Sequence, residues 1–540
     1  MRAAWRRIEP FVATKRAAAG LFGVALVIYW FEALAWPFER GRDAWDYMTY
    51  YLSFFDAHTP FPEVMLVRTP VTPFALGIPL SLGGVTSLEV TMAVLFALSV
   101  LAWSLAALAY SRLSALLVAA VLLASPGFAL SFHEASSDAI ASFVFALFAL
   151  GVVRTGFLPS AARFAALGAG AVMVTLTRPA YVGLIAGVLI PICLRGSWRS
   201  RLAWGGAYLG VFLTLLGSWA MLNDVRYGDF TISRLNITST PVRLVPDAGR
   251  ASRRLATIVR RDVLSLPPYR RLHVSLATYF DSELSGYDRI RLLGIADRAG
   301  GIGSDFLLLR ETAAEASASS SASSPAGGRH GTASASSVRG RLVSVAHAMW
   351  LYVSRPANRD QTHLKPVVWP TPPSTIVRNG KPYPNVAALP PAVEATTFGF
   401  FPCASNEIAR CILADPSKAY SDPREARRYA EVTRTVSRWD ARLGTGRPNR
   451  WLAIQLDRGA RHFPPPWLWL VAATVALPFR RTRGAGALVA LVGLAGVVLF
   501  VHAWAAGWFE AYAYPVLPAA LFAAICAGVG ERPRLVEGGG

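Results

Sequence analysis

The chain has 540 residues, of which 53% are hydrophobic and only 16% are charged. Because a soluble protein carries about a quarter charged residues, this composition excludes an ordinary soluble protein and indicates apolar segments long enough to cross a bilayer. The net charge of +21 is first explained by Lys and Arg that orient membrane helices, and second by contact with anionic membrane lipid. We therefore expect an all-α polytopic membrane protein with no nucleic-acid partner.

The predicted membrane helices fall into two groups. An N-terminal module, residues 1–222, begins with a retained helix at about Ala17–Trp36, which is too long for a signal-peptide core. A first outer loop, residues 37–85, follows it. The later predicted spans are about Ser87–Tyr110, Leu113–Leu130, Asp138–Val153, Ala161–Leu176, Ala180–Leu194 and Leu202–Leu222, then Pro465–Phe479, Ala485–Ala503 and Phe509–Gly528 within residues 465–540. Together these segments predict a bundle of about ten transmembrane helices.

Two pieces of the first outer loop have their own patterns. The aromatic residues between Trp45 and Phe55 predict a short helix at the membrane interface, where aromatic rings settle. The segment Val71–Leu82 is apolar, but it is short and interrupted by prolines. We expect it to be a re-entrant or interfacial piece that leads into the next helix.

The positions of the basic residues predict the orientation of the bundle. Five basic residues precede the first helix, with Glu9 as the one acidic residue, so the N-terminus is expected in the cytoplasm. The later inside loops carry Arg112, Arg154, Arg163, Arg195, Arg199, Arg201, Arg480, Arg481, Arg483, Arg532 and Arg534. This alternation predicts a multi-pass cell-membrane protein with both termini in the cytoplasm and the first loop outside.

The central region, residues 223–464, is hydrophilic and is also expected outside the cytoplasm. It is predicted to be mainly helical or irregular, with helical patterns around Arg253–Leu266, Val338–Val353 and Arg424–Asp440. The Ser/Ala/Gly-rich residues 315–337 predict a disordered linker, because they offer little apolar surface to bury. Cys403 and Cys411 lie in this region and could form a disulfide in an oxidising compartment.

Polar residues gather on the predicted outer face of the bundle. They are Asp43, Asp46, Tyr47, His58 and Arg68 in the first loop, His133, Glu134 and Asp138 in the next, and Arg178 and Tyr512 further on. Carboxylates beside a membrane span are costly to place and usually line a cavity or a reaction site.

These residue types suit sugar transfer outside the cell. No nucleotide sugar is available there, so the donor would be tethered to lipid. A carboxylate such as Asp43 or Asp46 would take the acceptor proton, and cations such as Arg68 and Arg178 would stabilise the departing lipid phosphate. His58 and His133 are further candidates for that second task. No CxxC or HExxH pattern indicates a built-in metal site, but carboxylates do not distinguish a base from a metal ligand, so a divalent cation is left open.

Five segments carry a family resemblance. They are DAWDY at Asp43–Tyr47, RTPVTPFALGIPL at Arg68–Leu80, SSDAIASFVFALFALGVVR at Ser136–Arg154, LTRPAYVGLI at Leu176–Ile185 and AYAYPVLPAA at Ala511–Ala520. In this order they resemble the D-E-x-x-Y, R-P-P-x-Y-P-L, T-E-x-L, L-T-R-P and R-Y-x-x-P-x-x-P segments of GT-C glycosyltransferases, which include bacterial aminoarabinose transferases and relatives of the protein O-mannosyltransferases. Ala44 replaces the Glu of the first motif, and Ala takes the Arg position of the last.

The resemblance implies a GT-C-type bundle and an inverting transferase that uses a polyprenyl-phosphate sugar donor. Asp43 falls on the family's catalytic carboxylate and Asp138 on its later acidic position. Asp46 lies one helical turn from Asp43 and could substitute for the missing Glu. The expected substrate-binding residues are Tyr47, His58, Arg68, His133, Glu134, Arg178 and Tyr512. The acceptor is left open as a glycan, a lipid or a protein.

Other interpretations compete with this one. Asp43 and Asp46 could form a solvated face, Arg68 and Arg178 could anchor lipid headgroups, and Asp138 could cap its helix. The whole protein could instead be a transporter or lipid flippase. Such proteins usually carry charged residues near the membrane midplane and internal repeats. It could also be a non-catalytic scaffold whose outer region binds cell-envelope polymer.

Overall fold

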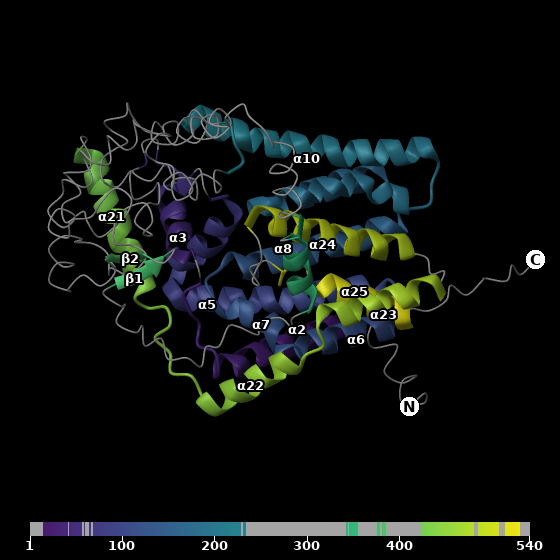
Figure 1. Cartoon of the computed structure of the whole chain (residues 1–540), viewed down its shortest axis with the longest axis horizontal. Coiled ribbons are helices and arrows are strands. Elements are labelled where there is room, and N and C mark those ends of the chain that lie inside the picture. The colour runs from purple at the N-terminus through teal and green to yellow at the C-terminus, as the bar shows by residue number, and fades with distance from the viewer. Residues whose placement is uncertain are drawn as a thin grey trace, which may run out of the picture.

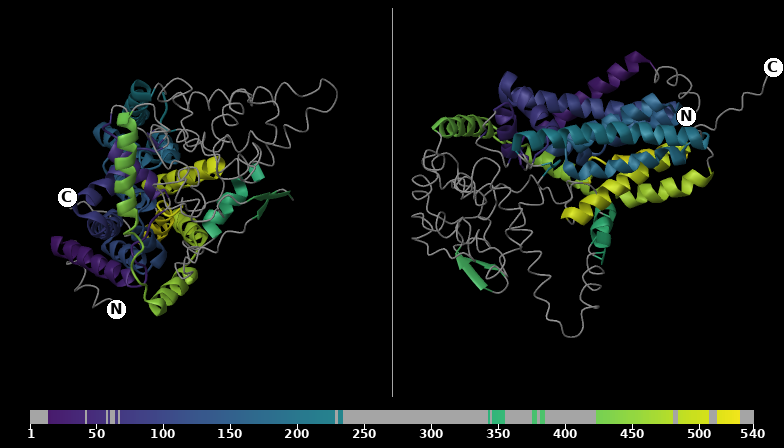
Figure 2. Two further views of the ribbon diagram at one scale, coloured as in Figure 1. Left: turned by 90° about the vertical axis from the view of Figure 1, so that its left-hand side faces the viewer. Right: turned by 90° about the horizontal axis from the view of Figure 1, so that it is seen from above.

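The computed structural model describes residues 14–41, 43–56, 59, 64–65, 68–227, 230–233, 342–343, 345–354, 375–378, 381–384, 423–479, 484–506 and 513–529. These residues form a bundle of helices whose long members run alongside one another (Figure 1). Helix α21 crosses one end of the bundle and packs against α3 (Figure 2).

The described elements are almost wholly helical. In chain order they are α2 (Lys15–Ala33), α3 (Ala44–Ser53), α5 (Val71–Leu108), α6 (Arg112–Leu123), α7 (Pro126–Leu130), η1 (Ser131–His133), α8 (Ser137–Phe157), α9 (Ala161–Thr175), η2 (Pro179–Cys193), α10 (Trp198–Tyr227), β1 (Thr375–Arg378), β2 (Lys381–Pro384), α21 (Pro423–Asp440), α22 (Arg450–His462), α23 (Pro466–Phe479), α24 (Ala485–Ala506) and α25 (Pro518–Val529). Strands β1 and β2 pair antiparallel, with Thr375 opposite Pro384.

Several of these helices meet the requirements for crossing a membrane. Five are long and apolar enough, namely α2, α5, α8, α10 and α24, and α6 with the α7–η1 segment forms a pair bent by 66° that would make a sixth. Helices α9, η2, α23 and α25 are apolar but shorter. The protein is therefore a multi-pass membrane protein. Each predicted span overlaps one of these apolar segments, although α25 begins nine residues after the predicted start of the last span, Phe509–Gly528. The shorter segments do not establish the predicted count of about ten.

Helix α5 lies at the centre of the packing, in contact with α2, α3, α6 and α8. The buried Trp103 of α5 contacts Phe145 of α8 and Phe522 of α25, with ring centroids 6.3 and 5.3 Å apart. Such aromatic pairs fill the space between neighbouring helices. On the other side, α9 approaches α10 so closely that a Cβ on Gly168 would overlap the Tyr208 carbonyl.

Helix α5 is broken near its start, where the sequence predicted a separate piece. Gly83 and Gly84 leave the helical conformation, and Gly84 has φ 68° and ψ −154°. That conformation is accessible essentially to glycine alone. The segment Val71–Leu82 is thus a helical piece that leads through a break into the predicted span.

The first loop and the central region match their predictions where they are described. Helix α3 occupies the aromatic stretch predicted as a short helix, and α21 occupies the predicted pattern at Arg424–Asp440. Helix α22 was not predicted; it begins after Asn449, whose side chain accepts a hydrogen bond from the Leu452 amide. The predicted helix at Arg253–Leu266, the predicted linker at residues 315–337, and Cys403 and Cys411 lie outside the described residues.

Candidate active site

Asp43 occupies an unusual backbone conformation at the start of α3. It has φ 64° and ψ 8°, and it is the one non-glycine residue with positive φ in the described part of the chain. An L-residue adopts this left-handed conformation at a cost of about 1 kcal/mol or more, although Asp and Asn tolerate it better than most. Asp43 holds the N-cap position but makes no capping hydrogen bond. Its carboxylate is directed elsewhere, and such strain is typical of functional sites.

That carboxylate meets Arg68, which also binds Asp46. The Nε and Nη2 atoms of Arg68 donate to Asp46 Oδ2 at 3.2 and 2.6 Å, and Nη1 donates to Asp43 Oδ2 at 3.2 Å. The Arg68 side chain is 14% exposed, Asp46 is 18% exposed and Asp43 is 36% exposed. Asp46 therefore anchors the guanidinium, whereas Asp43 combines an arginine contact with access from outside.

The environment keeps Arg68 charged. Burial lowers the pKa of its guanidinium, but the adjacent Asp43 and Asp46 outweigh that effect and hold the pKa well above its ordinary value. Arg68 and Asp46 are ion-paired and mostly shielded from solvent, which does not fit a solvated face for Asp46 or a headgroup anchor for Arg68.

Tyr47 lies beneath this cluster. Its ring centroid is 5.4 Å from the central guanidinium carbon of Arg68, a cation–π geometry. Burial raises the pKa of the Tyr47 hydroxyl, and Arg68 and Arg178 oppose the increase. The same hydroxyl is hydrogen-bonded to Ser137, the first residue of α8. Tyr47 thus connects the Arg68 cluster with the start of α8.

A second ion pair lies at that helix start. Arg178 Nη1 is 2.6 Å from Asp138 Oδ1, and the two side chains are 13% and 11% exposed. Asp138 stands in the first turn of α8, where the free backbone N–H groups favour a negative charge. Ser136 occupies the N-cap position but makes no capping hydrogen bond with its side chain, so a capping role for Asp138 in the first turn stays compatible with its ion pair. Arg178 immediately precedes η2 and faces inward onto this carboxylate.

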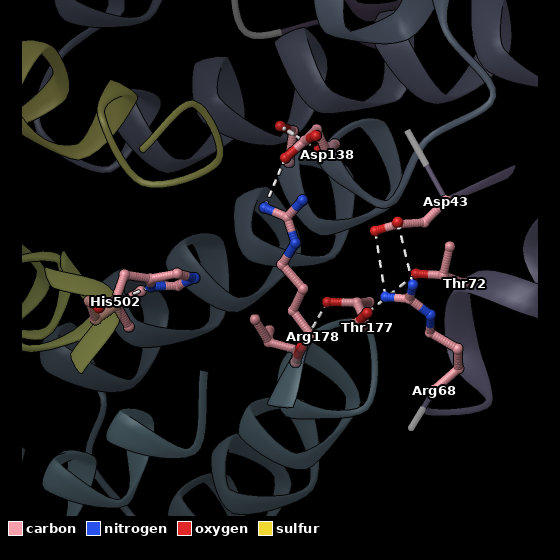
Figure 3. Close-up of polar contacts among 10 residues, drawn as sticks. Asp43, Arg68, Thr72, Asp138, Thr177, Arg178 and His502 are labelled. Atoms are coloured by element: carbon pink, nitrogen blue, oxygen red, sulfur yellow. Dashed lines mark hydrogen bonds and ion pairs between the residues drawn. The ribbon is translucent and has the colours of Figure 1, made fainter. Parts of the chain in front are cut away.

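Two backbone-directed hydrogen bonds bring the two ion pairs together. The Val71 amide donates to the Leu176 carbonyl at 3.1 Å, and the buried Thr72 hydroxyl donates to the Thr177 carbonyl at 3.2 Å. The start of α5, just after Arg68, is therefore fixed to the residues just before Arg178. Figure 3 shows Arg178 directed at Asp138 and Arg68 directed at Asp43, with Thr72 and Thr177 between the two arginine side chains.

The structure adds His502 to the residues expected from sequence. It is buried in α24 and points toward Arg178 from the side opposite Arg68 (Figure 3). Its Nδ1 is 2.8 Å from the Val498 carbonyl, and its ring lies edge-on to Tyr181 at 5.4 Å. A lone histidine inside an apolar span is itself a signal of function, and the sequence interpretation did not use it.

His133 and Glu134 support the first loop. His133 is buried, stacks on Tyr29 at 4.3 Å between ring centroids, and lies 4.0 Å from the Glu32 carboxylate. Backbone hydrogen bonds join Glu39 to residues 133 and 135 on either side of Glu134. A Cβ on the nearby Gly41 would overlap residues 135 and 136. This packing fixes the chain just before Asp43.

Two predicted substrate-binding residues and the possible divalent cation remain to be considered. His58 and Tyr512 lie outside the described residues. The described residues contain no group of three or more His, Cys, Asp or Glu side chains that could hold a metal ion. Arg68 already fills the position between Asp43 and Asp46, so a divalent cation would have to displace it. The side chains at this pair therefore fit a guanidinium better than a metal.

Comparisons with known proteins add one loose likeness. No protein-family model matches the chain, and no curated protein matches it. Among solved structures, the chain is similar to the crystal structure of ArnT from Cupriavidus metallidurans bound to undecaprenyl phosphate. The two are 15% identical, the match covers 86% of this chain and 81% of that chain, and the TM-score is 0.34. A likeness at this level does not establish a shared fold, so the proposals below rest on the described residues.

Proposed function

We propose that this protein is a membrane glycosyltransferase that moves a sugar from a polyprenyl-phosphate donor to an acceptor hydroxyl with inversion. The observation that carries the proposal is the sharing of one buried guanidinium, that of Arg68, between Asp46 and the more exposed Asp43. This arrangement combines a fixed cation with an accessible carboxylate in one place. A second fixed cation, Arg178, lies beside it.

The two arginines would hold the phosphate of the donor. A guanidinium presents several N–H donors in a planar fork, which suits two oxygens of a phosphate. Asp46 and Asp138 hold Arg68 and Arg178 in place at 2.6 Å each. Donors that are already oriented stabilise the charge that develops on a leaving group without further reorganisation. The lipid phosphate would therefore leave as an anion paired with both cations.

Asp43 would act as the general base. Its carboxylate takes the proton of the acceptor hydroxyl as the acceptor oxygen forms a bond to the anomeric carbon of the sugar. The bond from that carbon to the phosphate oxygen breaks, and its electron pair leaves with the lipid phosphate. One displacement of this kind inverts the anomeric centre and requires no covalent carboxylate intermediate. No step depends on a metal ion.

We place this reaction on the extracytoplasmic side, with both termini in the cytoplasm. Lys and Arg in the short loops support that orientation. The acceptor would be a glycan, a lipid or a protein in the cell envelope. The central region, residues 223–464, would bind the acceptor or cover the site.

The test replaces Asp43 with Asn. Asn keeps the shape of the side chain and tolerates the left-handed backbone, so the variant should fold. Purified protein in nanodiscs receives a panel of polyprenyl-phosphate pentoses and hexoses together with envelope extract, and mass spectrometry follows the products. We expect D43N to lose activity by about 100-fold to 10,000-fold, the range for general-base catalysis, while the dissociation constant for the donor changes little.

A matched control is Asp457→Asn on α22, where the carboxylate pairs with Arg461 at 2.7 Å. This variant should keep wild-type activity. Wild-type turnover by a folded D43N variant would overturn the assignment of Asp43. Absence of any sugar transfer or donor binding by the wild-type protein across the panel would overturn the proposed function.

A further inference from the structure

A polar pocket lies away from the arginine cluster, at the break in α5. It has a volume of about 730 Å³ and lies between the end of α2, the Gly83–Gly84 break and the segment 442–449. That volume falls within the range of about 300–1,000 Å³ for small-molecule sites. About a dozen helical residues at about 1.5 Å each separate this break from Arg68 along α5, so the pocket is distinct from the candidate active site.

The wall formed by segment 442–449 is held in place by the linker after α2. The Gly444 amide donates to the Phe38 carbonyl at 3.0 Å, and the Asn449 amide donates to the Leu34 carbonyl at 2.7 Å. Just before this wall, Asp440 pairs with Arg40 at 2.8 Å. The pocket is therefore formed from segments about 400 residues apart in the chain that are tied together at several points.

Charged groups of both signs line the pocket. Glu89 contributes a carboxylate from α5, and Arg442 and Arg447 contribute two guanidinium groups from the opposite wall. Arg442 reaches over the α5 break, where its Nη1 would lie 3.9 Å from a Cβ on Gly84. A carboxylate within a membrane helix is costly and usually serves a function. A ligand that carries both an anion and a cation would satisfy all three groups.

The position of the pocket points to a lipid as that ligand. It lies at the end of the membrane helix α2 and at the break within the membrane helix α5. Its far wall continues into α22, which lies along the edge of the bundle beside α7 (Figure 1). Trp451 of α22 is 69% exposed, and exposed tryptophan is typical of the zone of lipid headgroups.

We propose that this pocket binds the headgroup of a phosphoethanolamine lipid. Arg442 and Arg447 hold the phosphate, and Glu89 accepts hydrogen bonds from the primary ammonium. A phosphocholine headgroup cannot donate such hydrogen bonds, and a phosphoglycerol headgroup lacks the cation. The site thus discriminates among lipids by the ammonium group rather than by net charge.

The test measures lipid binding by the full-length protein, independently of sugar transfer. Native mass spectrometry of detergent-purified protein determines the affinities of phosphatidylethanolamine, phosphatidylcholine and phosphatidylglycerol with identical dioctanoyl chains. We expect phosphatidylethanolamine to bind about tenfold more tightly than either of the others. In Glu89→Gln, phosphatidylethanolamine should bind no more tightly than phosphatidylglycerol. Arg442→Ala with Arg447→Ala should weaken its binding about tenfold or more.

The control is a double variant that removes the same charge elsewhere, Arg434→Ala with Arg438→Ala on α21, whose side chains are exposed. It should bind phosphatidylethanolamine like the wild-type protein. Equal binding of the three lipids, tighter binding of phosphatidylglycerol, or a pocket variant indistinguishable from the control would each overturn the proposal.

A second measurement covers the case in which E89Q does not fold. Thr445, an exposed residue of the pocket wall, is replaced with Cys in a protein whose native cysteines are removed. Phosphatidylethanolamine should slow maleimide labelling of this cysteine several-fold more than phosphatidylcholine does. Equal protection by both lipids would contradict the proposal. Neither measurement requires the proposed transferase activity, so the two proposals can fail separately.

Discussion

At the residue scale, Asp43 and Asp46 differ in role although they share one arginine. Asp46 receives two N–H groups of Arg68 and is half as exposed as Asp43, 18% against 36%. Asp43 instead has the strained backbone and longer contacts with Arg68. Its Oδ1 lies 3.1 Å from Nη2, and its Oδ2 lies 3.2 Å from Nη1. A carboxylate that must receive and release a proton benefits from such accessibility. A carboxylate that positions an arginine, as Asp46 does, benefits from burial.

This difference predicts that Asp46→Asn changes the affinity for the donor, whereas Asp43→Asn changes turnover. An amide at this position removes the closest ionic contact of Arg68, so the guanidinium loses its orientation toward the donor phosphate. We expect the donor dissociation constant to rise about tenfold, because a hydrogen bond to a charged group contributes about 1.5–3 kcal/mol. Equilibrium binding of a radiolabelled polyprenyl-phosphate sugar measures the effect. If D46N lowered turnover without changing the donor dissociation constant, Asp46 would act in proton transfer together with Asp43 rather than in positioning Arg68.

Arg68→Lys tests whether the planar fork matters as well as the charge. A lysine ammonium is a point charge and cannot reproduce the three N–H contacts that Arg68 makes with the two aspartates. We expect R68K to bind the donor at least about tenfold more weakly, although the net charge is unchanged. The matched control is Arg428→Lys, since Arg428 pairs with Asp56 at 2.7 Å at the other end of α3. Equal donor affinity for R68K and R428K would show that charge alone suffices.

At the scale of elements, the candidate site depends on how the start of α5 docks against the chain before η2. The sequence predicted that the Arg68 and Arg178 segments belong to one site, but it did not predict the contact that joins them. That contact is the hydrogen bond from the buried Thr72 hydroxyl to the Thr177 carbonyl. A single hydroxyl between two segments that are distant in sequence leaves no periodic signal.

Thr72→Val removes this contact while keeping the side-chain shape. The Thr177 carbonyl would then lose a buried partner, which costs about 1–3 kcal/mol. We expect a lower melting temperature in detergent and weaker donor binding, because Arg178 follows Thr177 directly. Thr72→Ser retains the hydroxyl and should preserve most of the donor binding. Donor affinity that fell equally in both variants would assign the effect to lost packing rather than to the hydrogen bond.

The sequence also left polar residues within the apolar helices unassigned. His502, Glu32 and Glu89 each stand alone in an apolar segment, and no spacing pattern relates them to a partner. His502 points toward Arg178, Glu32 lies 4.0 Å from His133, and Glu89 lines the pocket at the α5 break. These arrangements arise from packing between distant parts of the chain. Asp43 and Asp46 were easier to relate, because one helical turn separates them. The left-handed backbone of Asp43 could not be predicted, because most Asp residues adopt other backbone conformations.

At the scale of the whole molecule, the elements that hold the candidate site share one end of the bundle. Helix α3 and the crossing helix α21 lie there (Figures 1 and 2). Arg428 of α21 donates to the Leu52 carbonyl at 2.7 Å and also pairs with Asp56. The described part of the central region therefore contacts the first loop directly. Apolar segments could be predicted from composition, but this contact depends on residues 372 positions apart in the chain.

The orientation of this end can be tested by cysteine labelling. Thr445→Cys marks the segment that follows α21, the helix packed against α3. Arg199→Cys marks the predicted inside loop at the start of α10, and both side chains are exposed. In intact cells that express a protein without native cysteines, a membrane-impermeant maleimide should label Cys at position 445. Position 199 should react only after permeabilisation, because the Arg-rich loop is retained in the cytoplasm. Labelling of position 199 in intact cells, with protection of position 445, would reverse the topology. The proposed base would then face the compartment that contains nucleotide sugars, and the argument for a lipid-linked donor would no longer hold.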